Sequence, residues 1–71
     1  MKIVLQNLDN LNYAHSHGVW TPHVDAAIGF SGVVNALDYA IKRRLVNVRI
    51  AMRFAYSAYD VDFPPVHSPL P

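Results

Sequence analysis

The residues best suited to bind a metal ion are histidines in the first third of the chain. His15 and His17 are two positions apart, so on an extended segment their side chains point to the same side. Three imidazoles and a carboxylate suit a tetrahedral zinc ion. No metal-binding motif of known spacing, such as His-Glu-x-x-His, accompanies them. A metal site is therefore one alternative hypothesis, and its ligands would be His15, His17, His23 and Asp25.

Basic residues gather in the segment 42–53, which holds five of the six lysines and arginines. Such a cluster can bind phosphate groups, and neighbouring tyrosines can stack on bases. Two structural roles compete with that hypothesis. Cations in the last turn of a helix complement its dipole, and arginines on a strand can pair with Asp60 and Asp62 on its neighbour. Nucleic acid is therefore kept as an alternative partner, with the candidate residues Lys42, Arg43, Arg44, Arg49 and Arg53.

Tyrosine side chains indicate a candidate surface for contact with protein. Tyrosine is common at interfaces because its ring buries a large area while its hydroxyl stays hydrogen-bonded or wet. One tyrosine is expected near the edge of a helix, and two more follow the strongest predicted strand. The surface predicted for self-association or for a protein partner consists of Tyr39, Arg49, Arg53, Tyr56 and Tyr59.

Residues that could carry catalysis are scarce. The sequence contains no cysteine and no glutamate, and its serines lack the Gly-x-Ser-x-Gly context of a nucleophile elbow. Gly29 and Gly32 are not followed by the lysine of a phosphate-binding loop. One helix and a thin sheet also leave little room for a ligand-sized pocket. We therefore expect a protein that is not an enzyme and that uses no cofactor.

Alternation of apolar and polar residues predicts an α+β domain with a small antiparallel-rich sheet of three to five short strands. One helix is expected at 32–45, packed on one face of the sheet, so that the order is strands, helix, strand. Thr21, followed by a proline, is expected to begin a single helical turn. Six segments are candidates for these three to five strands: 2–8, 11–15, 19–21, 27–30, 48–54 and 59–63.

The helix expected at 32–45 has a predicted apolar face whose members recur at spacings of three and four. Ser31 is expected to cap its start, and Asn47 is expected to adopt the left-handed conformation after its end. Leu37 lies in the middle of this predicted face, so an aspartate there would unfold the domain. The members of this predicted face are Val33, Val34, Leu37, Ala40, Ile41 and Leu45.

Composition favours a chain that does not act alone. Of the 71 residues, 52% are hydrophobic and only 15% are charged, against about 25% charged in an average domain. Domains of this size bury a small fraction of their surface and often need a disulfide, a metal or a second copy. Cysteine is absent and the net charge is only +1. A homodimer or a permanent protein partner is therefore expected, rather than a partner selected by overall charge.

Prolines divide the chain into two parts. Four of the five lie in the last eight residues, where they disfavour both helix and central strand. The expected organisation is a folded domain over 1–63 and a proline-rich extended tail over 64–71. The first residues lack the apolar stretch of a secretory signal, and no apolar run is long enough to cross a membrane. We therefore expect a cytoplasmic protein without a membrane partner.

Several features of the segment 11–63 occur together. They are a Gly-x-Trp-Thr turn at 18–21, an Ala-x-x-Phe step at 27–30 into a single helix with Ala36 and Leu37, and a closing strand that ends at Phe54. In these features the chain resembles short bacterial and phage-associated proteins of uncharacterised function. The resemblance implies the same order of strands, helix and strand. It implies no activity, so it assigns no functional residue.

Overall fold

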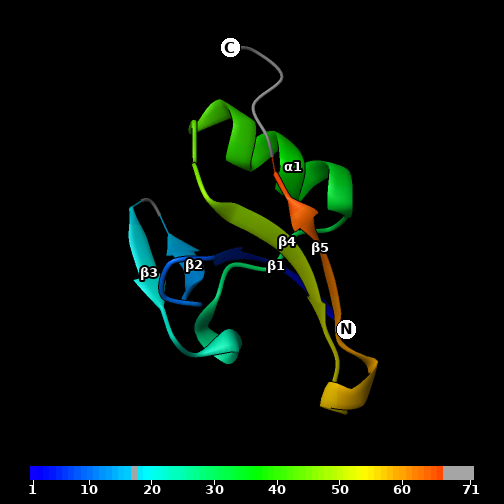
Figure 1. Ribbon diagram of the computed structural model, residues 1–71. Coiled ribbons are helices and arrows are strands. Elements are labelled where there is room, and N and C mark those ends of the chain that lie inside the picture. The colour runs from blue at the N-terminus through cyan, green and yellow to red at the C-terminus, as the bar shows by residue number, and fades with distance from the viewer. Residues whose placement is uncertain (17, 67–71) are drawn as a thin grey trace.

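A computed structural model describes residues 1–16 and 18–66 and has an α+β fold, as the sequence predicts. Five antiparallel strands form one open sheet in the order β3-β2-β1-β4-β5, and helix α1 lies across one face of it (Figure 1). In chain order the elements are β1 (Lys2–Asn7), β2 (Tyr13–Ser16), β3 (Val19–Thr21), the 3₁₀ turn η1 (Val24–Ala26), α1 (Val33–Lys42), β4 (Val48–Arg53), the 3₁₀ turn η2 (Ser57–Tyr59) and β5 (Val61–Pro65).

The centre of the sheet is the pair β1 and β4, which align over six residues from Lys2 opposite Arg53 to Asn7 opposite Val48. Side chains alternate between the two faces of a strand. The helix-side face of the pair therefore collects apolar residues such as Leu5, which is fully buried. The opposite face carries Gln6, which is almost fully buried, and the arginines of β4. The sheet consequently has an apolar face under α1 and a polar network on its other face.

Helix α1 packs on the sheet through its alanines. Ala36 and Ala40 are fully buried and belong to the same core cluster as the helix-side residues of β1 and β4. Leu37 and Ile41, predicted to lie in the core, are exposed instead. Val33 and Tyr39 pack partly buried against the same cluster, whereas Leu37 and Ile41 are turned away from the sheet. The prediction that Leu37 lies in the helix–sheet core is therefore wrong.

Both ends of α1 differ from the prediction. Gly32, not Ser31, occupies the N-cap position, and no side chain caps the helix; the Ser31 hydroxyl instead accepts a hydrogen bond from the Asn35 amide at 2.7 Å. At the other end Arg44 takes a left-handed conformation (φ 53°), and the N–H groups of Arg44 and Leu45 donate back into the last turn, each at 3.0 Å. This is a Schellman motif. It ends the helix before Asn47, which is also left-handed (φ 55°).

The segment between β3 and α1 follows the sheet without forming a strand. Residues 27–30 were expected as an edge strand, but only Phe30 makes a bridge, to Ile3 of β1. The one helical turn expected after Thr21 is η1, and its N-cap is His23, while the Thr21 hydroxyl accepts the His23 N–H at 3.1 Å. Ala27 packs against Val4 on the sheet face opposite α1. This segment therefore covers part of that face.

Strand β5 continues past the boundary expected for the folded part. It runs to Pro65, which lies opposite Arg49 of β4, and the Val66 N–H donates to the Val48 carbonyl at 2.8 Å. The expected tail over 64–71 therefore begins inside β5, and its last five residues lie outside the described ones. Within residues 1–16 and 18–66, no helix has both the length and the apolar character needed to cross a membrane.

Candidate functional site

The arginines of β4 form a bonded network on the sheet face opposite α1. Gln6 lies at its centre and accepts hydrogen bonds from Arg49 Nε at 2.8 Å and Arg53 Nη2 at 3.3 Å, while its amide nitrogen donates to the Leu11 carbonyl. Asp62 of β5 receives Arg53 Nη1 at 2.7 Å and lies 3.3 Å from Arg49 Nη2. The predicted pairing of these arginines with acidic residues on a neighbouring strand is therefore confirmed.

Arg53 has the largest number of partners in this network. Its guanidinium also donates to the Tyr13 hydroxyl at 3.2 Å and lies 3.7 Å from the Asp60 carboxylate. Burial by itself would lower the pKa of Arg53, but the hydrogen bonds to Tyr13 and Asp62 outweigh it and raise that pKa. Arg53 is therefore charged at every pH at which the protein would be studied. Its charge is matched inside the molecule rather than displayed to a ligand.

The other basic residues lie at the end of α1. Lys42 pairs with Asp38 one turn earlier at 3.0 Å, and the Arg43 guanidinium stacks over the Tyr39 ring at 3.9 Å. Arg44 occupies the left-handed position of the Schellman motif. Because α1 and the β4 arginines are on opposite faces of the sheet, the basic segment does not form one patch. Nucleic-acid binding stays a prediction, without a continuous surface to support it.

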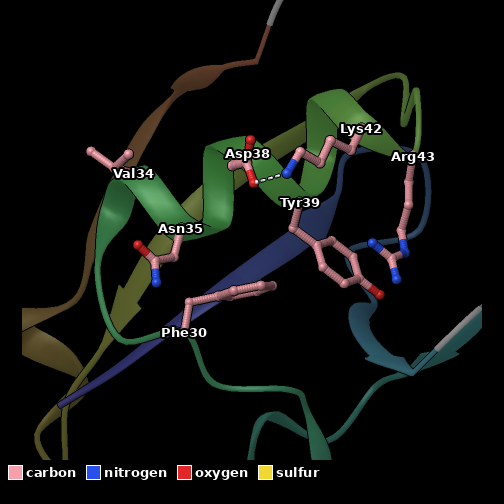
Figure 2. Close-up of a pocket in the computed structure, with 7 residues that line it drawn as sticks. All are labelled: Phe30, Val34, Asn35, Asp38, Tyr39, Lys42 and Arg43. Atoms are coloured by element: carbon pink, nitrogen blue, oxygen red, sulfur yellow. Dashed lines mark ion pairs between the residues drawn. The ribbon is translucent and has the colours of Figure 1, made fainter.

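An open hollow of about 540 Å³ lies beside α1. Figure 2 shows the rings of Phe30 and Tyr39 together there, with their centroids 5.2 Å apart in an edge-to-face arrangement, and the Asp38–Lys42 pair on the helix surface. Among the described residues, no buried side-chain polar atom lacks a hydrogen-bond partner. The hollow is an open depression on the surface, and its polar lining residues are exposed. It is lined by Phe30, Val34, Asn35, Asp38, Tyr39, Lys42 and Arg43.

The candidate metal ligands are on the surface near β2, β3 and η1. The His15 ring nitrogen Nδ1 lies 3.1 Å from the Ser16 hydroxyl. His23 and Asp25 are exposed at the start and in the middle of η1, and His17 lies outside the described residues. In the part of the chain that the structure describes, no three residues of metal-ligating type come together. The four candidate ligands therefore remain a hypothesis, because the structure does not describe an arrangement of them around a metal ion.

The five residues predicted as a contact surface are distributed over α1, β4 and the turn after β4. Tyr39 lies beside the hollow on α1, Arg49 and Arg53 belong to the network on the opposite face, and Tyr56 and Tyr59 are exposed near the turn between β4 and β5. Tyr39 is therefore apart from the arginines, whereas Arg53 adjoins the turn with the other two tyrosines through Asp60, at 3.7 Å.

Three residues that the sequence predicts to lie in the core are exposed on one side of α1. Val34, Leu37 and Ile41 are 75%, 37% and 43% exposed, and their spacing of three and four places them on one side of the helix. We call these three residues the apolar side of α1. Their periodicity was visible in the sequence, but periodicity alone does not distinguish a side that faces the sheet from one that faces outward.

Comparison with known proteins identifies no relative. No family model matches the chain, and neither a curated protein nor a solved structure matches it. The resemblance to short bacterial and phage-associated proteins stays a prediction.

Proposed function

We propose that the protein is a small non-enzymatic module that acts by self-association, and that the contact between copies is the apolar side of α1. The observation that carries this proposal is the inverted burial of the helix. Its alanines face the sheet, while Leu37 and Ile41 face outward beside the still more exposed Val34. Fully burying a leucine or isoleucine stabilises a protein by about 1.5–3 kcal/mol. A second copy that covers these side chains gains part of that free energy.

The other surfaces of the sheet are poorly suited to the same task. The outer edge of β5 contains Pro64 and Pro65, which have no N–H to donate, and β3 at the other edge is only three residues long. Prolines and short strands at sheet edges disfavour the addition of another strand. The face opposite α1 is occupied by the arginine network and by the packing of Ala27 against Val4. A contact through α1 leaves all of these features in place.

The size of α1 sets the expected strength of the contact. A helix of ten residues is about 15 Å long. Standard protein interfaces bury about 800 Å² per partner, roughly a sixth of this molecule's 4841 Å² surface. One side of so short a helix offers less than that. We therefore expect a reversible dimer with a Kd on the order of 100 μM rather than an obligate one.

Sedimentation equilibrium between about 10 μM and about 300 μM tests the proposal, since a Kd in that range moves the average mass measurably. Leu37→Asp places a charge in the contact and should give a monomeric mass over the whole range. Leu11→Asp is the matched control, because Leu11 is also an exposed leucine but lies between β1 and β2.

Two results would overturn the proposal. A wild-type protein that stays monomeric at about 300 μM would rule out self-association through α1. A Leu11→Asp protein that dissociates as completely as Leu37→Asp would show that the contact is not specific to α1. Circular dichroism of both variants checks that each remains folded.

A further inference from the structure

The turn between β4 and β5 carries exposed aromatic side chains that the α1 contact does not use. We call residues 54–59, with the sequence Phe-Ala-Tyr-Ser-Ala-Tyr, the tyrosine tip. Tyr56 and Tyr59 are 74% and 67% exposed, although both are large and partly apolar. Figure 1 shows this turn, η2, at the end of the molecule away from α1. The tip therefore presents aromatic surface at a site remote from the helix.

The rings of the tip are held in place without being buried. Tyr59 meets Phe54 and Tyr56 edge to face, with centroids 6.5 Å and 6.3 Å apart. Beneath them the Asp60 carboxylate accepts the Phe54 N–H at 2.9 Å, and the Tyr59 N–H donates to the Tyr56 carbonyl at 3.0 Å. Because the backbone of the turn is hydrogen-bonded and the rings already contact one another, a ligand does not have to form the turn first, so less free energy is lost on binding.

The chemistry of the tip selects an uncharged, extended ligand. Residues 54–59 contain no charged side chain, and the charged residues on either side of them, Arg53 and Asp60, pair with each other at 3.7 Å, so ionic ligands gain little there. Tyrosine rings offer flat apolar faces, and their hydroxyls can donate hydrogen bonds. Proline-rich segments meet these requirements, because proline rings pack on aromatic faces while the backbone carbonyls of the extended helix remain free to accept hydrogen bonds. Such segments also lose little entropy on binding.

We propose that the tyrosine tip binds the proline-rich segment around Pro69 and Pro71 of a second copy of this chain. This segment follows β5, whereas the tip precedes it, so the two are at opposite ends of the strand. Pro71 is five residues beyond Val66, which allows at most about 18 Å of fully extended chain. That is about the length of β5 itself, so the segment cannot turn back and also lie across its own tip. The contact joins two copies head to tail.

The proposal concerns a different surface from the apolar side of α1, and the experiment separates the two. The host is the full chain with Leu37→Asp, in which the α1 contact is removed. A peptide of residues 64–71 is titrated into it, and the amide resonances are followed by NMR. We expect saturable shifts centred on residues 54–60 with a Kd on the order of 1 mM. A peptide with alanine in place of all four prolines should give no saturable shifts.

Variants of the tip assign the contact. Tyr56→Ala should weaken peptide binding about tenfold, because it removes one exposed ring with little effect on the fold. Tyr56→Phe, which keeps the ring, should weaken it by less, and Tyr39→Phe on α1 is the matched control that should leave it unchanged. Binding that persists in Tyr56→Ala, equal binding of the alanine peptide, or saturable shifts away from the tip would each overturn the proposal. So would the absence of shifts at about 5 mM peptide. None of these results depends on whether α1 self-associates.

Discussion

Replacing Arg53 by methionine tests whether the arginine network on the sheet face opposite α1 stabilises the fold. Methionine keeps much of the length of the arginine stem and loses the guanidinium. The change removes hydrogen bonds to Tyr13, Asp62 and Gln6 and the ion pair with Asp60. The Arg53 side chain is only 14% exposed, so solvent cannot fully replace those partners.

The expected loss of stability depends on which interactions each partner of Arg53 retains in the variant. Removing one member of a buried ion pair costs about 3–5 kcal/mol when the remaining charge is left alone. Here Asp62 keeps Arg49 at 3.3 Å, and Asp60 keeps the Phe54 N–H, so neither carboxylate is left without a partner. Both carboxylates are also partly exposed. We therefore expect the free energy of unfolding to fall by about 2–3 kcal/mol, below the range for an isolated buried pair.

Urea denaturation followed by Trp20 fluorescence measures this loss, and Lys42→Met provides the matched control. Lys42 is also paired with an aspartate, but its side chain is 71% exposed. An exposed pair four residues apart on a helix contributes only about 0.3–0.5 kcal/mol. With a slope near 1 kcal/mol per molar urea, typical of so small a domain, Arg53→Met should lower the midpoint by about 2–3 M and Lys42→Met by less than about 0.5 M.

The direction of the Arg53 pKa shift predicts how the stability difference between wild type and Arg53→Met depends on pH. That pKa is raised in the folded protein, so the contribution of the charge is present at all lower pH values and is lost only as the pH rises through the folded pKa, at the alkaline extreme. The difference between Arg53→Met and wild type should therefore be the same at about pH 6 and about pH 9. Equal losses for the Arg53 and Lys42 variants would refute the reasoning, because they would show that the buried network stabilises no more than an exposed pair.

Three further predictions concern local features, and each is checked by the same urea measurement. Ala40→Leu should destabilise by about 1–3 kcal/mol because it forces α1 away from the sheet, whereas Ala58→Leu in the exposed turn η2 should change stability by less than about 0.5 kcal/mol; similar values would contradict the buried alanine side of α1. Arg44→Gly should stabilise by up to about 1 kcal/mol, since glycine adopts the left-handed conformation (φ 53°) without strain, and a clear loss would contradict the Schellman assignment. Asp60→Asn keeps an acceptor for the Phe54 N–H and should cost less than Asp60→Ala, for which we expect about 1–2 kcal/mol; equal costs would show that this hydrogen bond does not hold the turn.

The strands and the fold class could be predicted from the sequence because alternation reports directly on a two-faced sheet. In β4, Val48 and Ile50 alternate with Arg49, and the structure buries the first two under α1 while Arg49 joins the network on the other face. The pairing with Asp62 followed from the same alternation on the neighbouring strand. The helix ends were less predictable, because Arg44 is an unusual residue for a left-handed position and Ser31 resembles a cap without acting as one.

The orientation of α1 was predicted only in part: Val33, Ala40 and Leu45 pack on the core as expected, but the rest of the predicted apolar face is exposed, which bears directly on function. Two sides of the helix compete for the sheet: one with Ala36 and Ala40, the other with Leu37 and Ile41. Judged by hydrophobicity alone, the second should be buried. The alanines are instead the fully buried side chains of α1 over Leu5 and Ile50, and Val33 and Tyr39 pack partly buried against the same core. Because α1 buries its alanines, it leaves Leu37 and Ile41 exposed beside Val34, so packing inside one copy creates the surface through which we expect two copies to meet.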